Sequence, residues 1–282
     1  MRQHLNADPE LAPIGVFDSG VGGLSVLGEI RRQLPAEKLI YLADQAHVPY
    51  GPRTLEEVRF FSSQISRYLL EQGAKLIVVA CNTASAAALH DLRVAFPGTP
   101  FVGMEPAVKP AAETTRSGVV GVLATPATFQ GALYASVVER FAQGVRLIQD
   151  TCPGLVGQIE AGFLDGAETR LILERSLAPM LAEGIDTIVL GCTHYPFVIP
   201  IIQEIAGPQV RVIDPAPAVA RQVGRVLASR GLLNPGEQPG DLRCLTTGNP
   251  GKLQALLPQL IRESCNVRRL QWSSSGLDAD EH

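Results

Sequence analysis

Residues 73–81 read G-A-K-L-I-V-V-A-C, and residues 184–192 read G-I-D-T-I-V-L-G-C. Each stretch has a glycine, then an apolar run typical of a buried parallel strand, then a cysteine eight residues after the glycine. Small polar residues follow both cysteines: Asn82-Thr83 after Cys81, and Thr193-His194 after Cys192. We therefore expect two related half-structures that each present one thiol at a strand end. A site with a cysteine on either side suits the transfer of a proton from one face of a carbon to the other.

The duplication extends beyond the cysteines. I-G-V-F-D-S at 14–19 aligns with V-G-V-L-A-T at 120–125. Two halves with the same order of elements predict two similar domains related by a pseudo-two-fold axis. We expect a first domain at 12–105 plus 214–272, a second domain at 106–213, and flexible tails at 1–11 and 273–282.

Short β-branched runs alternate with longer amphipathic segments along the chain. The expected strands are 14–18, 39–43, 76–80, 101–103, 119–124, 145–149, 187–190, 210–213 and 242–246. The expected helices are 23–33, 54–72, 85–95, 128–141, 168–183, 197–205, 216–230 and 253–262. This alternation predicts an α/β fold with doubly wound parallel sheets and right-handed crossovers. Because ligands bind at the carboxyl ends of such strands, we expect an active site in the cleft between the domains.

Composition narrows the classes of function. The chain has 282 residues, of which 46% are hydrophobic and 18% charged, with a net charge of −4, and this balance is typical of a soluble globular protein. No basic cluster indicates a nucleic acid or an anionic membrane as a partner, and no apolar run is long enough to cross a bilayer. The polar start of the chain lacks the apolar region of a secretory signal, so we expect a cytoplasmic location.

The five cysteines have wide spacings that are not typical of a disulfide framework, and no C-x-x-C pair indicates zinc. Cys152, Cys244 and Cys265 are most simply interpreted as small buried residues. Cys81 and Cys192 differ, because two cysteines at equivalent places in a duplicated fold are not well explained by packing alone. A thiol just before a helix also lies at the positive end of that helix, which lowers its pKa.

A glycine-rich turn, D-S-G-V-G-G-L at 18–24, lies between the first expected strand and helix. It lacks the G-x-G-x-x-G pattern of a dinucleotide-binding loop and the G-K-[ST] ending of a P-loop. Asp18 either caps the helix or acts as a base or proton-holding partner of a nearby thiol.

A second turn, P-Y-G-P-R at 49–53, follows the carboxyl end of another expected strand. It is either a surface turn or a wall of the cleft. In the second case Pro49 is part of the wall, and Tyr50 and Gly51 contact a ligand through backbone groups.

Polar residues at the other strand ends suit an anionic ligand. Asn82, Thr83 and the first N–H groups of the following helix can bind a carboxylate, and Thr125 lies at the corresponding end of another strand. His194 either shares a proton with Cys192 or is a structural histidine.

Four motifs occur in order: I-G-V-F-D-S-G-V-G-G-L-S-V (14–26), Y-L-A-D-Q-A-H-V-P-Y-G-P-R (41–53), V-A-C-N-T-A-S-A (79–86) and G-C-T-H-Y-P (191–196). As a set they resemble the glutamate racemases of the aspartate/glutamate racemase family, over most of the chain. The G-D-T-A-R type string of that family reads A-D-Q-A-H here, at 43–47. The family's enzymes are isomerases that use no cofactor and supply D-glutamate for the peptidoglycan of the cell wall.

The resemblance implies that Cys81 and Cys192 are the two acid/base thiols. It implies that Asp18 assists Cys81 and that Glu160 and His194 assist Cys192. The expected substrate-binding residues are Asp18, Ser19, Pro49, Tyr50, Gly51, Asn82, Thr83, Thr125, Thr193 and His194. The resemblance also implies glutamate as the substrate, no cofactor, no metal and a homodimer.

Three alternatives to a glutamate racemase stay open. The first is a related racemase that acts on aspartate or another small acid. The second is a decarboxylase or isomerase on the same scaffold, which often has one thiol, and the third is a two-lobed amino-acid-binding protein. The paired thiols argue against the last two, because rigid groups need one base on each face to invert a carbon.

Overall fold

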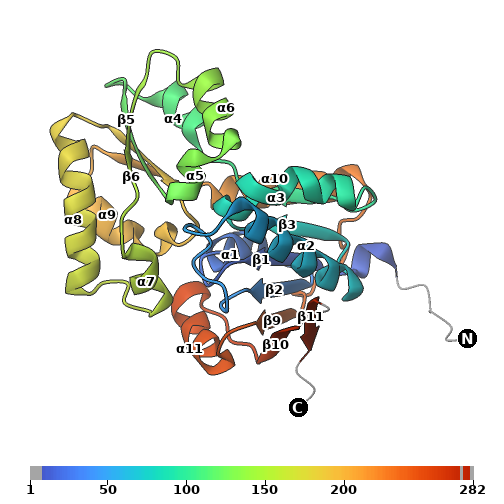
Figure 1. Cartoon of the computed structure of the whole chain (residues 1–282). Coiled ribbons are helices and arrows are strands. Elements are labelled where there is room, and N and C mark those ends of the chain that lie inside the picture. The colour runs from blue at the N-terminus through green and yellow to red at the C-terminus, as the bar shows by residue number, and fades with distance from the viewer. Residues whose placement is uncertain (1–7, 274–275, 280–282) are drawn as a thin grey trace, which may run out of the picture.

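Two β-sheets organise the chain in the computed structural model, which describes residues 8–273 and 276–279 (Figure 1). The larger sheet contains β1 (Ile14–Asp18), β2 (Leu39–Ala43), β3 (Leu76–Val79), β4 (Phe101–Gly103), β9 (Leu242–Thr246), β10 (Val267–Ser273) and β11 (Gly276–Ala279), in the order β11-β10-β9-β2-β1-β3-β4. The smaller sheet contains β5 (Val119–Ala124), β6 (Arg146–Asp150), β7 (Thr187–Gly191) and β8 (Arg211–Ile213), in the order β6-β5-β7-β8. All paired neighbours are parallel except β10 and β11. The prediction of an α/β fold with parallel sheets in two domains is confirmed.

The smaller sheet repeats the strand order of part of the larger one. The run β2-β1-β3-β4 corresponds to β6-β5-β7-β8, and the two cysteines of the opening stretches follow the equivalent strands β3 and β7. The glycines at the start of the two stretches also have the same role. Gly73 (φ 83°) and Gly184 (φ 77°) turn the chain into β3 and β7 with a positive φ that favours glycine.

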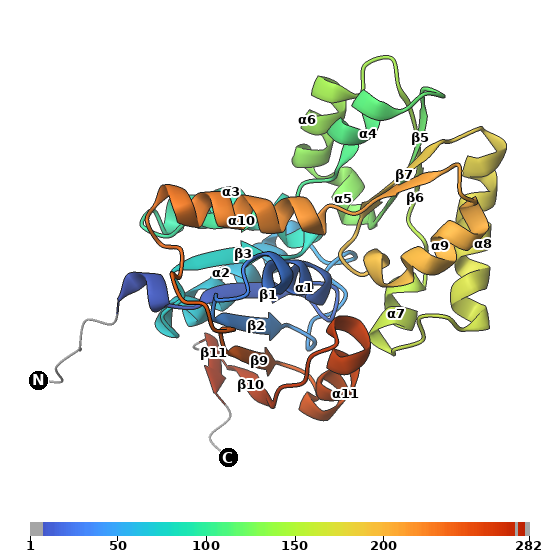
Figure 2. The same cartoon turned by 180° about the vertical axis from the view of Figure 1, so that it is seen from behind.

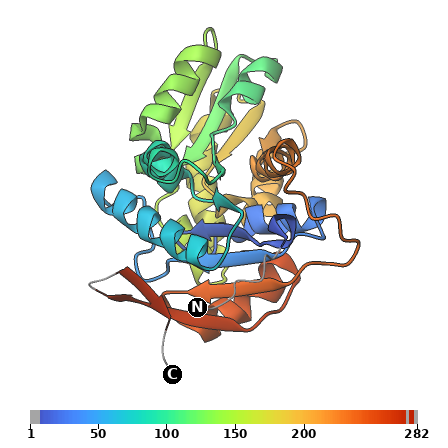
Figure 3. The same cartoon turned by 90° about the vertical axis from the view of Figure 1, so that its right-hand side faces the viewer.

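Helices cover both faces of each sheet. The helices of the chain are α1 (Leu24–Gln33), α2 (Leu55–Glu71), α3 (Asn82–Ala95), α4 (Val108–Thr114), α5 (Pro126–Gln130), α6 (Ala132–Phe141), α7 (Leu155–Glu160), α8 (Ala167–Ala182), α9 (Ile199–Ala206), α10 (Ala216–Ser229) and α11 (Pro250–Ile261). Figure 3 shows α2 and α3 on one side of the larger sheet and α1 and α10 on the other. In Figure 2, α4 and α6 lie on one side of the smaller sheet and α8 and α9 on the other.

Three apolar clusters hold these layers together. The first packs Val16 and Val78 of the larger sheet against α1, α10 and α11, and continues into the smaller sheet and α8. The second lies between the larger sheet, α2 and α3, and the third between the smaller sheet, α4 and α6. Because the first cluster runs through both sheets, the two domains share buried contacts.

The C-terminal end of the chain differs from the prediction. Residues 273–282 were expected to be flexible, but Ser273 belongs to β10 and residues 276–279 form β11, which pairs with β10. The burial pattern of β10 is mostly exposed, so its sequence lacks the apolar run of a central strand. At the other end, Pro9–Leu11 form a short 3-10 helix within the expected 1–11 tail. Residues 1–7, 274–275 and 280–282 lie outside the described residues.

The helix expected at 128–141 is wrong in detail, because Gly131 separates α5 from α6. The short helices α4 and α7 were not expected. The chain passes from the larger to the smaller sheet between β4 and β5 and returns between β8 and β9; the domain boundaries at 105/106 and 213/214 stay a prediction. Within the part of the chain that the structure describes, no helix has the length and apolar character needed to cross a membrane.

Candidate active site

Cys81 and Cys192 line the same cavity. Cys81 follows β3 of the larger sheet and Cys192 follows β7 of the smaller sheet, so each domain supplies one thiol. The cavity is lined by Ser19, Pro49, Tyr50, Gly51, Cys81, Asn82, Thr83, Thr125, Val156, Gly191, Cys192, Thr193 and His194. Every expected substrate-binding residue except Asp18 is in this lining. Asp18 and Glu160 do not line the cavity but contact the lining residues Thr193 and His194. Val156 and Gly191 of the lining were not expected.

Cys81 caps the helix α3. Its Sγ accepts a hydrogen bond from Ala84 N at 3.5 Å, in the position that an N-cap side chain takes. Burial, followed by the negative charge of Asp18, nevertheless raises the pKa of the Cys81 thiol well above its usual value. The expected lowering by the helix end is therefore wrong for Cys81 in this structure, because loss of hydration outweighs the helix contribution.

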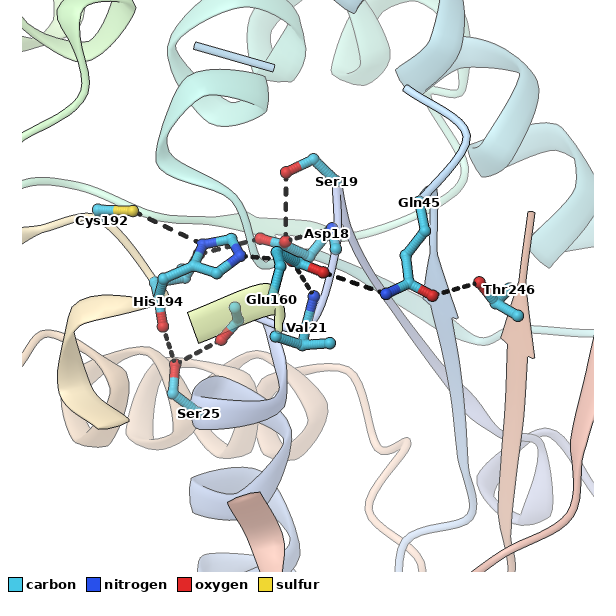
Figure 4. A network of polar contacts seen from close by, with 12 residues as sticks. Asp18, Ser19, Val21, Ser25, Gln45, Glu160, Cys192, His194 and Thr246 are labelled. Carbon is cyan, nitrogen blue, oxygen red and sulfur yellow. Dashed lines mark hydrogen bonds and ion pairs between the residues drawn. The ribbon is translucent and has the colours of Figure 1, made fainter. Parts of the chain in front are cut away.

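Cys192 is partnered by an ion pair. His194 Nδ1 lies 3.7 Å from Cys192 Sγ, and His194 Nε2 lies 2.7 Å from Glu160 Oε1 (Figure 4). Burial acts to lower the pKa of His194, but its hydrogen bonds to Cys192 and Glu160 outweigh burial and raise that pKa well above its usual value. Burial likewise acts to raise the pKa of Glu160, but His194, the Val21 N–H and Gln45 together outweigh it and the pKa is lowered. At neutral pH this is a charged imidazolium and carboxylate beside the sulfur of Cys192.

Asp18 connects the first domain to the second. It is fully buried at the end of β1, where Oδ1 accepts from Gly20 N at 2.8 Å and Oδ2 accepts from Thr193 Oγ1 at 3.0 Å. Burial raises the pKa of Asp18 from 3.8 to about 6, against the opposing effect of the His194 charge. Its carboxyl therefore titrates close to neutral pH, which suits a group that holds or releases a proton.

We expect Asp18→Asn to stabilise the folded protein at pH 7 by about 3 kcal/mol while lowering any activity. The pKa rises from 3.8 to about 6 on folding, so below pH 3.8 both states hold the proton. Between these values the unfolded state releases its proton first, and stability falls as the pH rises. Asparagine cannot ionise, so urea unfolding should show the variant more stable at pH 7 and nearly equal to wild type at pH 4. A variant equally destabilised at both pH values would contradict the raised pKa of Asp18 in the folded protein.

Asp44 anchors the turn that carries Tyr50. The fully buried Asp44 carboxylate accepts hydrogen bonds from Tyr50 Oη (2.7 Å), Thr247 Oγ1 (2.7 Å) and Trp272 Nε1 (2.8 Å), and lies 2.9 Å from His47 Nδ1. The cavity wall at 49–51 is thereby fixed to β9 and β10. Sequence reasoning found Tyr50 but missed this anchor, because its partners are up to 228 residues away along the chain.

Asn82 has an unfilled capacity for hydrogen bonds. Its side chain is buried and lines the cavity, yet Oδ1 and Nδ2 have no hydrogen-bond partner among the described residues. An unpaired buried amide is unfavourable, so these atoms suit a polar ligand in the cavity. Nearby, Thr83 Oγ1 lies 3.1 Å from Thr125 Oγ1, which is a further polar contact between the domains.

The glycine-rich turn leaves room for side chains of the second domain. A Cβ at Gly20 would lie 2.7 Å from Glu160 Cδ, and a Cβ at Gly22 would lie 2.6 Å from Thr193 Oγ1 and collide with the His194 ring. The turn therefore brings its backbone close to the ion pair: Val21 N donates to Glu160 Oε1 at 2.7 Å. Over the described residues, no cluster of three or more His, Cys, Asp or Glu side chains is arranged to hold a metal ion.

A cleft between two parallel-sheet domains with one buried thiol from each defines an enzyme of the α/β racemase class. The chain belongs to the Asp/Glu/Hydantoin racemase family, whose model matches residues 14–223. A glutamate racemase from Roseiflexus sp. (strain RS-1) is 54% identical over 255 residues, which are 90% of this chain and 94% of that protein.

Solved structures that are similar to this chain belong to the same family. A glutamate racemase isoform from Bacillus anthracis is 34% identical with a TM-score of 0.82, covering 92% of this chain and 97% of that one. The glutamate racemase from Thermus thermophilus in complex with β-chloro-D-alanine is 41% identical with a TM-score of 0.78, covering 94% of this chain and 98% of that one.

Proposed function

We propose that this chain interconverts L-glutamate and D-glutamate by moving the Cα proton between Cys81 and Cys192. The observation that carries the proposal is the presence of one thiol from each domain, at equivalent strand ends, in a single cavity. The glutamate racemase names of close relatives support glutamate as the substrate.

In this mechanism one thiolate removes the proton and the opposite thiol returns one to the other face. A carbon acid some ten pKa units weaker than a thiol places the carbanion about 14 kcal/mol uphill, which is within the range that enzymes overcome. Asp18 assists Cys81, and the Glu160–His194 pair assists Cys192. The direction of the reaction decides which sulfur begins as the thiolate.

Substrate binding makes the thiol chemistry easier. The unpaired Asn82 amide, Thr83, Thr193 and nearby backbone N–H groups suit the substrate carboxylates. The substrate ammonium beside the thiols favours a thiolate and offsets the burial that raises the pKa of Cys81. The cavity measures ≈ 20 Å³, about enough for one water molecule, so glutamate needs a wider cleft than the one in this structure.

A circular-dichroism assay without added cofactor tests this proposal. Solutions of L-glutamate and of D-glutamate should both lose their signal to the same racemic endpoint. Aspartate should turn over far more slowly under the same conditions. No change with either glutamate enantiomer, or faster loss of signal with aspartate, would count against glutamate racemisation.

The cellular setting follows from the family and stays a prediction. D-glutamate is the expected product used for peptidoglycan in the cell wall, and the cytoplasm is the expected location. The homodimer is likewise a prediction that rests on the family alone.

A further inference from the structure

Glu160 receives a hydrogen bond from the other domain at its second carboxylate oxygen (Figure 4). Gln45 Nε2 donates to Glu160 Oε2 over 3.1 Å, whereas Glu160 Oε1 is shared by Val21 N and His194 Nε2, each at 2.7 Å. Gln45 follows β2 in the first domain, and Glu160 ends α7 in the second. Among residues 8–273 and 276–279, Gln45 alone donates to Oε2. This contact therefore sets how the carboxylate is rotated.

Thr246 sets the orientation of the Gln45 amide. The Thr246 side chain is fully buried at the end of β9, and its Oγ1 accepts a hydrogen bond from Gly248 N at 3.0 Å. Its own hydrogen is then free to be donated to Gln45 Oε1, at 2.9 Å. With the amide oxygen held by this donor, the amide nitrogen faces Glu160.

We propose that Gln45, oriented by Thr246, is a positioning residue for the Cys192 side of the reaction, an inference that rests on the proposed racemase function. Gln45 donates a hydrogen bond to Glu160, and Glu160 Oε1 lies 2.7 Å from His194 Nε2. On the other side of the same ring, His194 Nδ1 lies 3.7 Å from Cys192 Sγ. The contact also joins the first domain to the second. Gln45 stands where the G-D-T-A-R type string has threonine, whose side chain is shorter and has no amide donor.

The same contact affects the charge on Glu160. A donor to a carboxylate favours its ionised form, and Gln45 contributes in this way to the lowered pKa of Glu160. The titratable groups that act on Glu160 are His194 from the turn after β7, Asp18 from β1 and Tyr41 from β2, and Cys192 acts on His194 in turn. Without Gln45, Glu160 would take up a proton at a higher pH and hold His194 less firmly.

Gln45→Met tests the role, since methionine has a similar length but no donor. We expect kcat/KM for glutamate to fall about tenfold, or about 1.4 kcal/mol, with little change in the thermal unfolding midpoint. The lower part of the acidic limb of kcat/KM against pH, where Glu160 rather than Asp18 takes up a proton, should move to higher pH. Thr246→Val removes the orienting hydroxyl and should move the limb in the same direction, whereas Thr246→Ser keeps the hydroxyl and should retain the wild-type profile.

Gln149→Met is the matched control, because Gln149 Nε2 donates to Tyr134 Oη at 2.9 Å outside the cavity. It should keep wild-type activity and pH profile. A Gln45→Met enzyme within twofold of wild type, or one with lower activity but an unmoved acidic limb, would overturn the positioning role. Wild-type protein with no activity on glutamate would instead count against the proposed function, so the two failures are distinguishable.

Discussion

Cys81→Ser and Cys192→Ser should each lower kcat/KM for glutamate racemisation by roughly 10²- to 10⁴-fold. An alcohol is a far weaker acid than a thiol, so serine cannot supply the base at one face of the substrate. Because the two enantiomers have equal free energies, kcat/KM must fall equally in both directions, whichever thiol is changed. Serine can still accept the Ala84 N–H at the start of α3, so the loss should not come from unfolding.

Cys265→Ser is the control for these variants. Cys265 is a half-buried free thiol that does not line the site cavity, and its replacement should leave kcat/KM close to wild type. Polarimetry or circular dichroism with each enantiomer measures the rates, and thermal unfolding checks the fold. Near-normal racemisation by either Cys81→Ser or Cys192→Ser would end the two-thiol account.

Gly22→Ala should lower kcat/KM by about 10²-fold, the loss that a misplacement of about 1 Å can produce. The added methyl would lie 2.6 Å from Thr193 Oγ1 and collide with the His194 ring. To make room, the Thr193 and His194 side chains or the second domain must shift away from the turn, which disturbs the Asp18–Thr193 contact and His194 beside Cys192.

Gly28→Ala separates this effect from the general cost of changing a glycine. Gly28 lies inside α1, where a new Cβ would meet Ile261 Cγ2 at an ordinary 3.5 Å and no other atom of the described residues outside its own helix within 4 Å. Alanine in a helix interior gains roughly 0.5–1 kcal/mol over glycine, so this variant should be as active as wild type and slightly more stable. A Gly22→Ala enzyme as active as Gly28→Ala would show that the close approach at the turn has no catalytic consequence.

The sheets and the thiols were predictable because their signals are local. Buried parallel strands appear in the sequence as short apolar runs. Gly73 and Gly184, which precede β3 and β7 with a positive φ, show where two of these runs begin. The antiparallel pair β10 and β11 was missed because β10 is an exposed strand near the sheet edge with few apolar residues.

Glu160 shows why the support of the site was less predictable. It ends a helix of six residues that follows Gly154 (φ 91°), so no helical periodicity develops in the sequence. Its position depends on Val21 and Gln45, which are 139 and 115 residues away. Without the family resemblance, neither Glu160 nor its partner Gln45 carried a local signal. The raised pKa of Cys81 was missed for a similar reason, since burial depends on the assembled cavity.

The most direct test of the two-base account is the fate of the Cα hydrogen when L-glutamate or D-glutamate is incubated with the protein in deuterated water. At low conversion, the product enantiomer should carry deuterium at Cα, because it is protonated by the thiol that has exchanged with solvent. The recovered substrate should keep its original hydrogen. Equal deuterium in recovered substrate and product, or product that retains the substrate hydrogen, would mean that one group serves both faces and would contradict the roles of Cys81 and Cys192.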